Sequence, residues 1–213
     1  MKKSIFLCIL LIISLLSTAQ NQQNSVKKIL DKTYENIKKY KGLAFRFTYQ
    51  WNYPKGDIQG TEEGTLYVSG KKYRLTLIDI IQICDGSNIY TISPKNKEVT
   101  ISNIKSGENL LSLIQILATY DENYTLTKDT LKKIDKKNIR FTRLDPKDKK
   151  STEYLLVGIN TTDHTLYQVI KIGKDNNTTT ITIRKQIPWT KVESSLLKFN
   201  PKDYPDHMIT TLN

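Results

Sequence analysis

The sequence has few of the residues that carry metal or redox chemistry. Its 213 residues include only two cysteines and two histidines. Two cysteines are too few for a multi-bridge disulfide scaffold, and two histidines leave little material for a metal site. The chain also lacks a Gly-x-Ser-x-Gly motif, a phosphate-binding Gly-rich loop and a His-Glu-x-x-His motif. We therefore expect no cofactor, no metal ion and no catalytic residue, and a protein that is not an enzyme.

Two pairs of adjacent carboxylates are the only candidate catalytic groups in the sequence, and they are of the kind that a hydrolase needs. Glu62-Glu63 and Asp121-Glu122 have the residue types that a glycosidase uses in a cleft. Adjacent residues of a strand point to opposite faces, however, and both pairs are expected to flank turns, so solvated loop charges are the favoured interpretation. A secreted, sheet-rich hydrolase that uses Glu62 or Glu63 stays open as an alternative.

The N-terminus has the pattern of a cleaved export signal. Lys2 and Lys3 precede an apolar run over residues 5–16, and small residues follow at 17–19. The run is shorter than the roughly 20 residues that a membrane-spanning helix needs. We predict a signal peptide over residues 1–19 and one domain over residues 20–213, with no internal repeat and no Gly-, Ser- or Pro-rich linker.

Export changes the meaning of the basic composition. The whole chain has 33 Lys and Arg against 21 Asp and Glu, a net charge of +12. Removal of the signal peptide takes away two lysines and one cysteine, which leaves a net charge of +10 and a single thiol, Cys84. An exported protein does not meet chromosomal DNA, so nucleic acid is excluded as the expected partner.

The periodicity of the mature chain predicts one helix followed by strands. Apolar residues at helical spacing predict an amphipathic helix over residues 25–41, and after Gly42 the period changes from 3.6 to 2. Short strands with tight turns, such as the one at Asp85-Gly86, predict a meandering antiparallel sheet. The predicted strands cover residues 43–51, 64–69, 73–77, 80–84, 88–93, 98–102, 123–126, 138–143, 153–159, 166–173, 178–186 and 196–200, followed by a frayed tail.

A second predicted helix, over residues 104–120, is unusually apolar. Together with the first helix it offers cover for one face of the sheet, which an antiparallel sheet requires. If the cover is complete, these residues are an ordinary core. If the cover is loose, the space beneath it is an apolar cavity suited to an acyl chain.

The order of several short motifs resembles that of the periplasmic outer-membrane lipoprotein carriers, the LolA-like family. The resemblance covers nearly all of the mature chain and marks a divergent branch. Its motifs are Leu43-Ala44-Phe45-Arg46-Phe47-Thr48, Gly64-Thr65-Leu66-Tyr67-Val68, Tyr73-Arg74-Leu75, Asp85-Gly86-Ser87-Asn88-Ile89-Tyr90 with Ser93-Pro94, and Leu197-Lys198-Phe199-Asn200-Pro201.

The resemblance implies a mainly β fold: an incomplete, half-open antiparallel β-barrel with a helical lid and an apolar cavity. It implies a periplasmic monomer that shields the acyl chains of lipoproteins received from an inner-membrane ABC exporter. Delivery would be to the outer membrane, through an acceptor protein or an anionic membrane surface. The residues expected to contact acyl chains are Phe45, Phe47, Leu75, Leu77, Ile83, Ile89, Leu110, Leu113, Ile114 and Leu117.

One departure concerns the lid. The family carries an arginine that holds the lid closed in the turn after the Leu-aromatic-Val strand, whereas this chain has Lys71 and Lys72 there. A lysine is a point donor and lacks the fork of arginine, so an equivalent latch through either lysine is an open question. An envelope sensor of lipids or lipoproteins, with the same fold, is the alternative function.

The positive charge is concentrated in one block. Residues 128–150 hold ten basic and four acidic residues, and Phe141 is their only aromatic residue, which argues against a base-stacking surface. We expect a docking patch for an acidic partner or an anionic membrane surface. Its candidate residues are Lys132, Lys133, Lys136, Lys137, Lys149 and Lys150.

Overall fold

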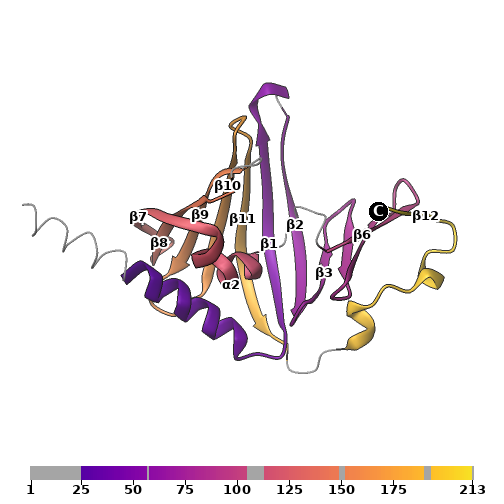
Figure 1. Cartoon of the computed structure of the whole chain (residues 1–213), viewed down its shortest axis with the longest axis horizontal. Helices are drawn as coiled ribbons and strands as arrows, with labels where there is room; N and C mark the ends of the chain where they lie inside the picture. Colours follow the sequence, from indigo (N-terminus) through magenta and orange to yellow (C-terminus); the bar gives the residue numbers. More distant parts are fainter. Residues whose placement is uncertain (1–24, 57, 105–112, 149–151, 190–192, 213) are drawn as a thin grey trace, which may run out of the picture.

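The computed structural model describes residues 25–56, 58–104, 113–148, 152–189 and 193–212. Within these residues, twelve strands form one open sheet, and the helices lie in front of it in the view of Figure 1. The predicted signal peptide, Leu110, Lys149 and Lys150 lie outside the described residues. The mainly β, half-open antiparallel fold that the sequence predicted is confirmed.

The strands follow one another through the sheet with few exceptions. Their order across the sheet is β12-β6-β5-β4-β3-β2-β1-β11-β10-β9-β8-β7, and all pairs are antiparallel except β12 with β6. Strand β1 pairs with β2 on one side and β11 on the other, which joins the two halves of the chain. The strands are β1 (Leu43–Tyr53), β2 (Ile58–Ser69), β3 (Lys72–Thr76), β4 (Ile81–Cys84), β5 (Asn88–Ser93), β6 (Glu98–Asn103), β7 (Tyr124–Ile134), β8 (Lys137–Pro146), β9 (Thr152–Asn160), β10 (Leu166–Gly173), β11 (Thr178–Pro188) and β12 (Met208–Thr211).

Two α-helices cover the sheet. The N-terminal helix spans residues 25–38, and it buries Val26, Leu30 and Ile37 while its lysines face solvent. Helix α2 (Leu113–Asn123) buries Ile116, Leu117 and Tyr120. Both helices pack against the same core cluster, as predicted from the amphipathic pattern of the first helix and the apolar sequence of the second.

Three predictions about the second half of the chain are wrong. Strand β7 runs from residue 124 to 134, far beyond the predicted end at 126, because its partner β8 and not its own polar sequence holds it extended. Residues 194–197 and 201–203 form short 3-10 helices, η2 and η3, where a strand had been predicted over 196–200. The tail, expected to be frayed, ends in β12, which pairs with β6.

The sheet has a buried apolar cluster on each of its two faces. Over β1–β3 and β8–β11, most of the buried apolar side chains belong to the cluster under the two helices, and we call this side the helix-covered face. Over β4–β6, a smaller cluster of Ile83, Ile92 and Val99 packs against Phe199 and Tyr204 of the C-terminal segment. The register places this cluster on the opposite, outer face, since Ile83 lies opposite Arg74, the neighbour of Leu75.

Candidate functional site

The candidate site is the helix-covered face around a row of residues that crosses the sheet. Phe45 of β1 lies opposite Leu66 of β2, which lies opposite Leu75 of β3. All three are 2–3% exposed, and they belong to the cluster that also holds Leu117 and Tyr120 of α2. Directly opposed residues share one face of a sheet, so the row forms a continuous apolar strip beneath the helices.

Most of the predicted acyl-contact residues share this face. Phe45, Phe47, Leu75, Leu77 and Leu117 all belong to the same cluster. Ile89, 2% exposed, lies opposite Cys84, which lies opposite Tyr73, so it faces the same side two strands beyond β3. Leu113 and Ile114 lie in α2, but their side chains are outside the described part of the structure.

Ile83 is the exception, because the structure places it on the other side of the sheet. It belongs to the outer cluster together with Ile92 and Val99. The prediction placed Ile83 on the same face as Ile89. Strand β4 carries Ile83 and Cys84 side by side, and the alternation of side chains sends them to opposite faces.

A glycine lets an aromatic ring lie flat on this face. Gly64 of β2 lies opposite Phe47, and a Cβ at Gly64 would come within 2.4 Å of the Phe47 ring. Leu77 would also be too close, at 2.8 Å. A side chain at position 64 therefore requires the Phe47 ring and Leu77 to shift.

Polar atoms without a partner border the apolar row. Tyr73 Oη, Gln82 Oε1 and Gln186 Oε1 are buried, and none has a hydrogen-bond partner within the described residues. Gln82 lies opposite Leu75 and Gln186 lies opposite Phe45, so the two amides stand at the two ends of the row. Burial also raises the pKa of Tyr73. An unpaired buried polar group costs about 1–3 kcal/mol, so these atoms are able to hydrogen-bond to a polar group that enters beside the row.

The two helices are fastened to each other by a polar contact, which we call the helix latch. Tyr120 Oη of α2 donates a hydrogen bond to Asp31 Oδ1 at 2.7 Å and accepts one from Lys27 Nζ at 3.1 Å. Lys27 Nζ also lies 3.5 Å from Asp121 Oδ2. Burial and the bond to Asp31 raise the pKa of Tyr120 to about 12. Sequence reasoning missed this latch, because residues 27 and 120 are brought together only by the tertiary fold.

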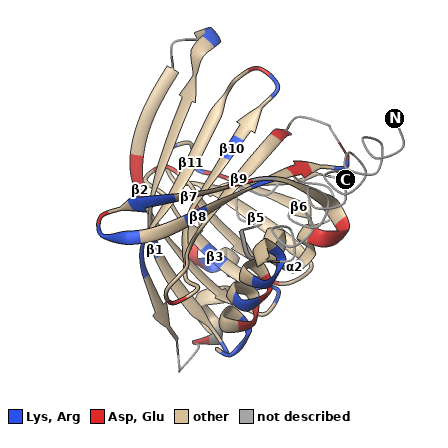
Figure 2. Cartoon of the chain, turned by 90° about the vertical axis from the view of Figure 1, so that its left-hand side faces the viewer, with Lys and Arg blue, Asp and Glu red and all other residues tan. Residues whose placement is uncertain are grey.

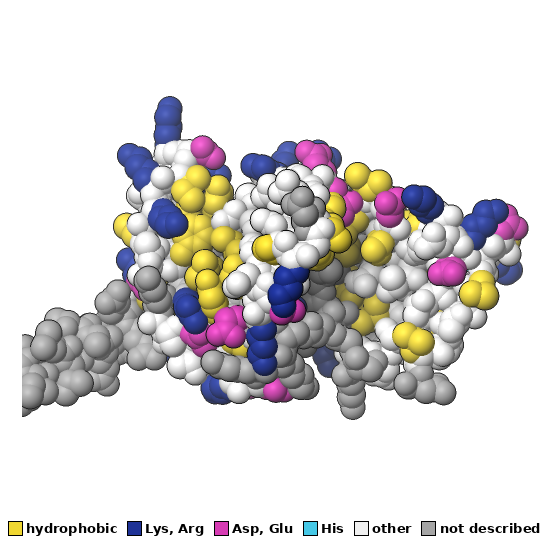
Figure 3. All heavy atoms as spheres, turned by 90° about the horizontal axis from the view of Figure 1, so that it is seen from above, with side chains coloured by type: hydrophobic (Ala, Val, Ile, Leu, Met, Phe, Trp, Pro, Cys, Tyr) yellow, Lys and Arg dark blue, Asp and Glu magenta, His cyan; other side chains and the backbone are white. Residues whose placement is uncertain are grey.

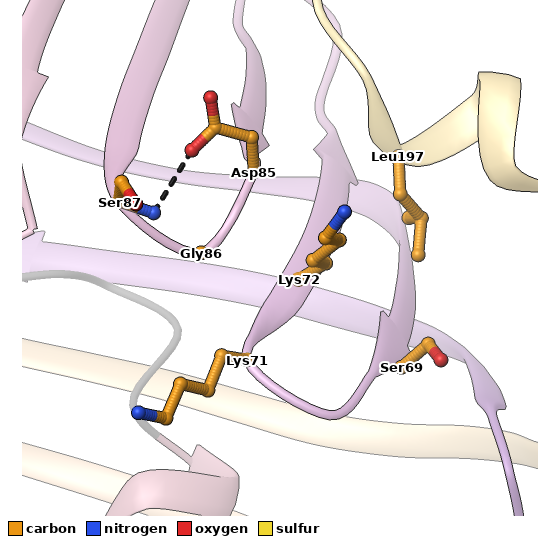
Figure 4. Close-up of a pocket in the computed structure, with 7 residues that line it drawn as sticks. All are labelled: Ser69, Lys71, Lys72, Asp85, Gly86, Ser87 and Leu197. Atoms are coloured by element: carbon orange, nitrogen blue, oxygen red, sulfur yellow. Dashed lines mark hydrogen bonds between the residues drawn. The ribbon is translucent and has the colours of Figure 1, made fainter.

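Lys71 and Lys72, the predicted latch residues, line a separate hollow. It has a volume of about 530 Å³ and is also lined by Asp85, Gly86 and Leu197 among others. The two lysine side chains extend in different directions from the β2–β3 turn, as Figure 4 shows. A contact of either lysine with the lid stays a prediction.

Glu62 and Glu63 do not share one face of the sheet. Glu62 and Glu63 lie within β2 and not beside a turn, so the strand directs them to opposite faces. Glu62 Oε2 accepts a hydrogen bond from the backbone N–H of Ile78 at 3.1 Å. Among the described residues, no group of three or more His, Cys, Asp or Glu side chains is placed to hold a metal ion.

The predicted docking lysines lie together at the end of the β7–β8 hairpin. Lys132, Lys133, Lys136 and Lys137 are all exposed, on both sides of the turn between these strands. Lys132 Nζ lies 5.6 Å from the centroid of the Phe141 ring.

No protein-family model and no curated protein sequence matches the chain. Solved structures do resemble it. An uncharacterized conserved protein from Thermus thermophilus matches with a TM-score of 0.59 and 10% identity, over 88% of this chain and 99% of that one. A LolA superfamily protein from Nitrosomonas europaea matches with a TM-score of 0.44 and 9% identity, over 81% of this chain and 96% of that one.

A further similar structure is an outer membrane lipoprotein-sorting protein domain from Vibrio parahaemolyticus. It matches with a TM-score of 0.46 and 10% identity, over 81% of this chain and 98% of that one. The chain therefore shares the fold of the Thermus thermophilus protein.

Proposed function

We propose that this chain is a non-enzymatic periplasmic carrier that shields acyl chains between the helix-covered face and the two helices. The observation that carries the proposal is the apolar row of Phe45, Leu66 and Leu75 with unpaired polar atoms at its borders. Acyl chains fit the apolar strip, Tyr73 Oη can donate to an ester or amide carbonyl group, and Gln82 Oε1 can accept from an amide N–H. In the proposed cycle, an inner-membrane ABC exporter supplies an acylated lipoprotein, and the carrier releases it to the outer membrane.

Energetics favour a carrier whose lid opens. Each sequestered methylene group is worth about 0.8 kcal/mol, so two or three acyl chains offset the opening of several packing contacts. The helix latch is polar and partly solvated, with Lys27 and Asp31 side chains 48% and 50% exposed, so it breaks at low cost. A polar latch over an apolar face is the arrangement that such exchange requires.

Exposed apolar residues support delivery to a membrane. Ile78 is 74% exposed and Ile80 is 40% exposed in the loop between β3 and β4. Figure 3 shows hydrophobic side chains reaching the surface between polar ones in the view from above. None of the helices in the described part of the chain is both long and apolar enough to cross a membrane.

The two tryptophans allow a direct test with brominated acyl chains, which quench tryptophan on contact. Trp51 packs against the cluster of the helix-covered face, whereas Trp189 packs edge-on against Tyr67, 5.3 Å away. Tyr67 lies opposite Arg74, on the outer face. In a Trp189→Phe variant, a brominated diacyl lipid should quench the remaining Trp51. In the matched Trp51→Phe variant, the same lipid should leave the fluorescence of Trp189 unquenched.

A charge on the face should abolish binding. Phe47→Glu should reduce quenching of Trp51 at least about tenfold, because it places a carboxylate in the apolar strip. Thr65→Glu adds the same charge on the other face of the neighbouring strand and should leave quenching unchanged. Circular dichroism checks that both variants fold. Equal quenching of the two tryptophans, or none in the folded protein, would contradict the proposal.

A further inference from the structure

Strand β7 gives the sheet a long open edge. It is the last strand in the sheet order, it has 11 residues, and among the described residues no strand pairs with its outer side. An edge strand presents alternate backbone N–H and C=O groups to whatever lies beside it. The opposite edge, β12, has only four residues. β7 is therefore the longer place at which another strand could be added.

The β7–β8 hairpin has more basic than acidic residues, so only part of its positive charge is neutralised by its own carboxylates. Residues 124–146 contain seven Lys and Arg against three Asp, a net charge of +4. Both arginines are paired: Arg140 Nη1 lies 3.1 Å from Asp129 Oδ2, and Arg143 Nη2 lies 2.7 Å from Asp145 Oδ1. The surplus therefore consists of lysines, and Figure 2 shows Lys and Arg gathered at the turn of the hairpin.

The lysines beside the β7 edge lie on both faces of the sheet, and this arrangement favours one kind of partner over another. Lys132 lies opposite Ile139 and Lys133 lies opposite Asn138, so the two lysines point to opposite faces of the sheet. Leu131, 56% exposed, shares a face with Lys133. A flat membrane surface can meet only one of these faces. An extended chain lying beside β7 has side chains on both faces and can meet both lysines.

Charge also decides against a second copy of this chain. Two β7 edges placed side by side would bring lysines against lysines on both faces, and like charges directly opposite are destabilising. The same lysines attract a strand that carries carboxylates. Such a partner gains main-chain hydrogen bonds from the edge and specificity from its alternate side chains.

We propose that β7 accepts an extended acidic segment of a partner protein as an added strand of the sheet. The inference does not depend on the cargo, because it rests on the open backbone edge of β7 and on the exposed lysines of the hairpin, and not on the apolar row. The added strand pairs with the outer side of β7, with carboxylates toward Lys132 and Lys133 and an apolar side chain beside Leu131.

A synthetic peptide of alternating Glu and Val residues tests the proposal on the mature full-length chain. We expect saturable binding by fluorescence anisotropy, weakened by salt, together with slowed amide exchange in β7. A peptide of equal charge with proline at alternate positions lacks half of the N–H donors and should bind at least about tenfold more weakly. The double variant Lys132→Glu, Lys133→Glu should lose peptide binding while keeping its circular dichroism spectrum.

The matched control is Lys95→Glu with Lys202→Glu, which makes the same change of charge at exposed lysines outside the hairpin and should leave binding unchanged. Three results would overturn the proposal. The first is equal binding of the proline peptide, and the second is equal loss of binding in the control variant. The third is capture of phosphatidylglycerol vesicles by the hairpin lysines while the peptide fails to bind, which would assign this edge to a membrane.

Discussion

Tyr120 connects the two helices that cover the candidate site. Its hydroxyl group contacts both Asp31 and Lys27, so one side chain holds α2 against the N-terminal helix. The sequence predicted that both helices would have an apolar face. It could not predict this contact, because the residues around Tyr120 in the sequence do not indicate which distant side chain its hydroxyl group will bond.

Tyrosine ionisation should therefore loosen the protein at high pH. Burial, together with the bond to Asp31, raises the pKa of Tyr120 to about 12 from its ordinary value of 10.0. Because the folded state holds the proton more tightly, the stabilisation is complete below pH 10 and is lost as the pH rises to about 12. The free energy of unfolding in urea, measured at intervals across this range, should fall. Tyr120→Phe should show a shallower fall, and identical slopes for variant and parent would contradict the assignment.

At the scale of elements, the sequence predicted correctly the strands and turns whose own residues show the expected pattern. The alternating residues of β1 and the Asp85-Gly86 turn were both predicted correctly. In that turn, Asp85 Oδ1 accepts the N–H groups of Ser87 and Asn88, each at 2.9 Å. Elements held by distant partners were missed, since β12 forms only because the C-terminal segment returns to β6.

A stack of aromatic rings holds this returning segment. The Phe199 ring lies 4.4 Å from Tyr90 and 5.6 Å from Tyr204, centroid to centroid, nearly parallel to both. Phe199→Ala should lower the free energy of unfolding by about 2–3 kcal/mol and speed amide exchange in β12. Tyr204→Phe keeps the stack and serves as the control. Unchanged exchange in β12 after Phe199→Ala would show that the segment docks by other contacts.

At the scale of the whole molecule, one sheet serves two cores on opposite faces. Sequence patterns identified nearly all the apolar strand residues, yet they could not assign Ile83 to the outer face. The face of a strand residue depends on register with its neighbours, and a one-residue change of register moves it to the other side. The same limit applies to Gln82 and Gln186, which resemble ordinary surface residues until the register places them beside Leu75 and Phe45.

A binding surface made by the helices and the sheet together implies that a ligand stabilises the whole fold. A ligand that binds only the folded state at about 100 times its Kd adds about 2.7 kcal/mol to the free energy of unfolding. For a domain of this size, that gain raises the Tm by about 5–10 °C. Calorimetry of the mature chain with a soluble acylated peptide should show this shift, and the same peptide without its acyl chain should not. Phe47→Glu should abolish the shift while Thr65→Glu retains it. If the acylated and the non-acylated peptide give the same Tm in all three proteins, the helix-covered face is an ordinary core.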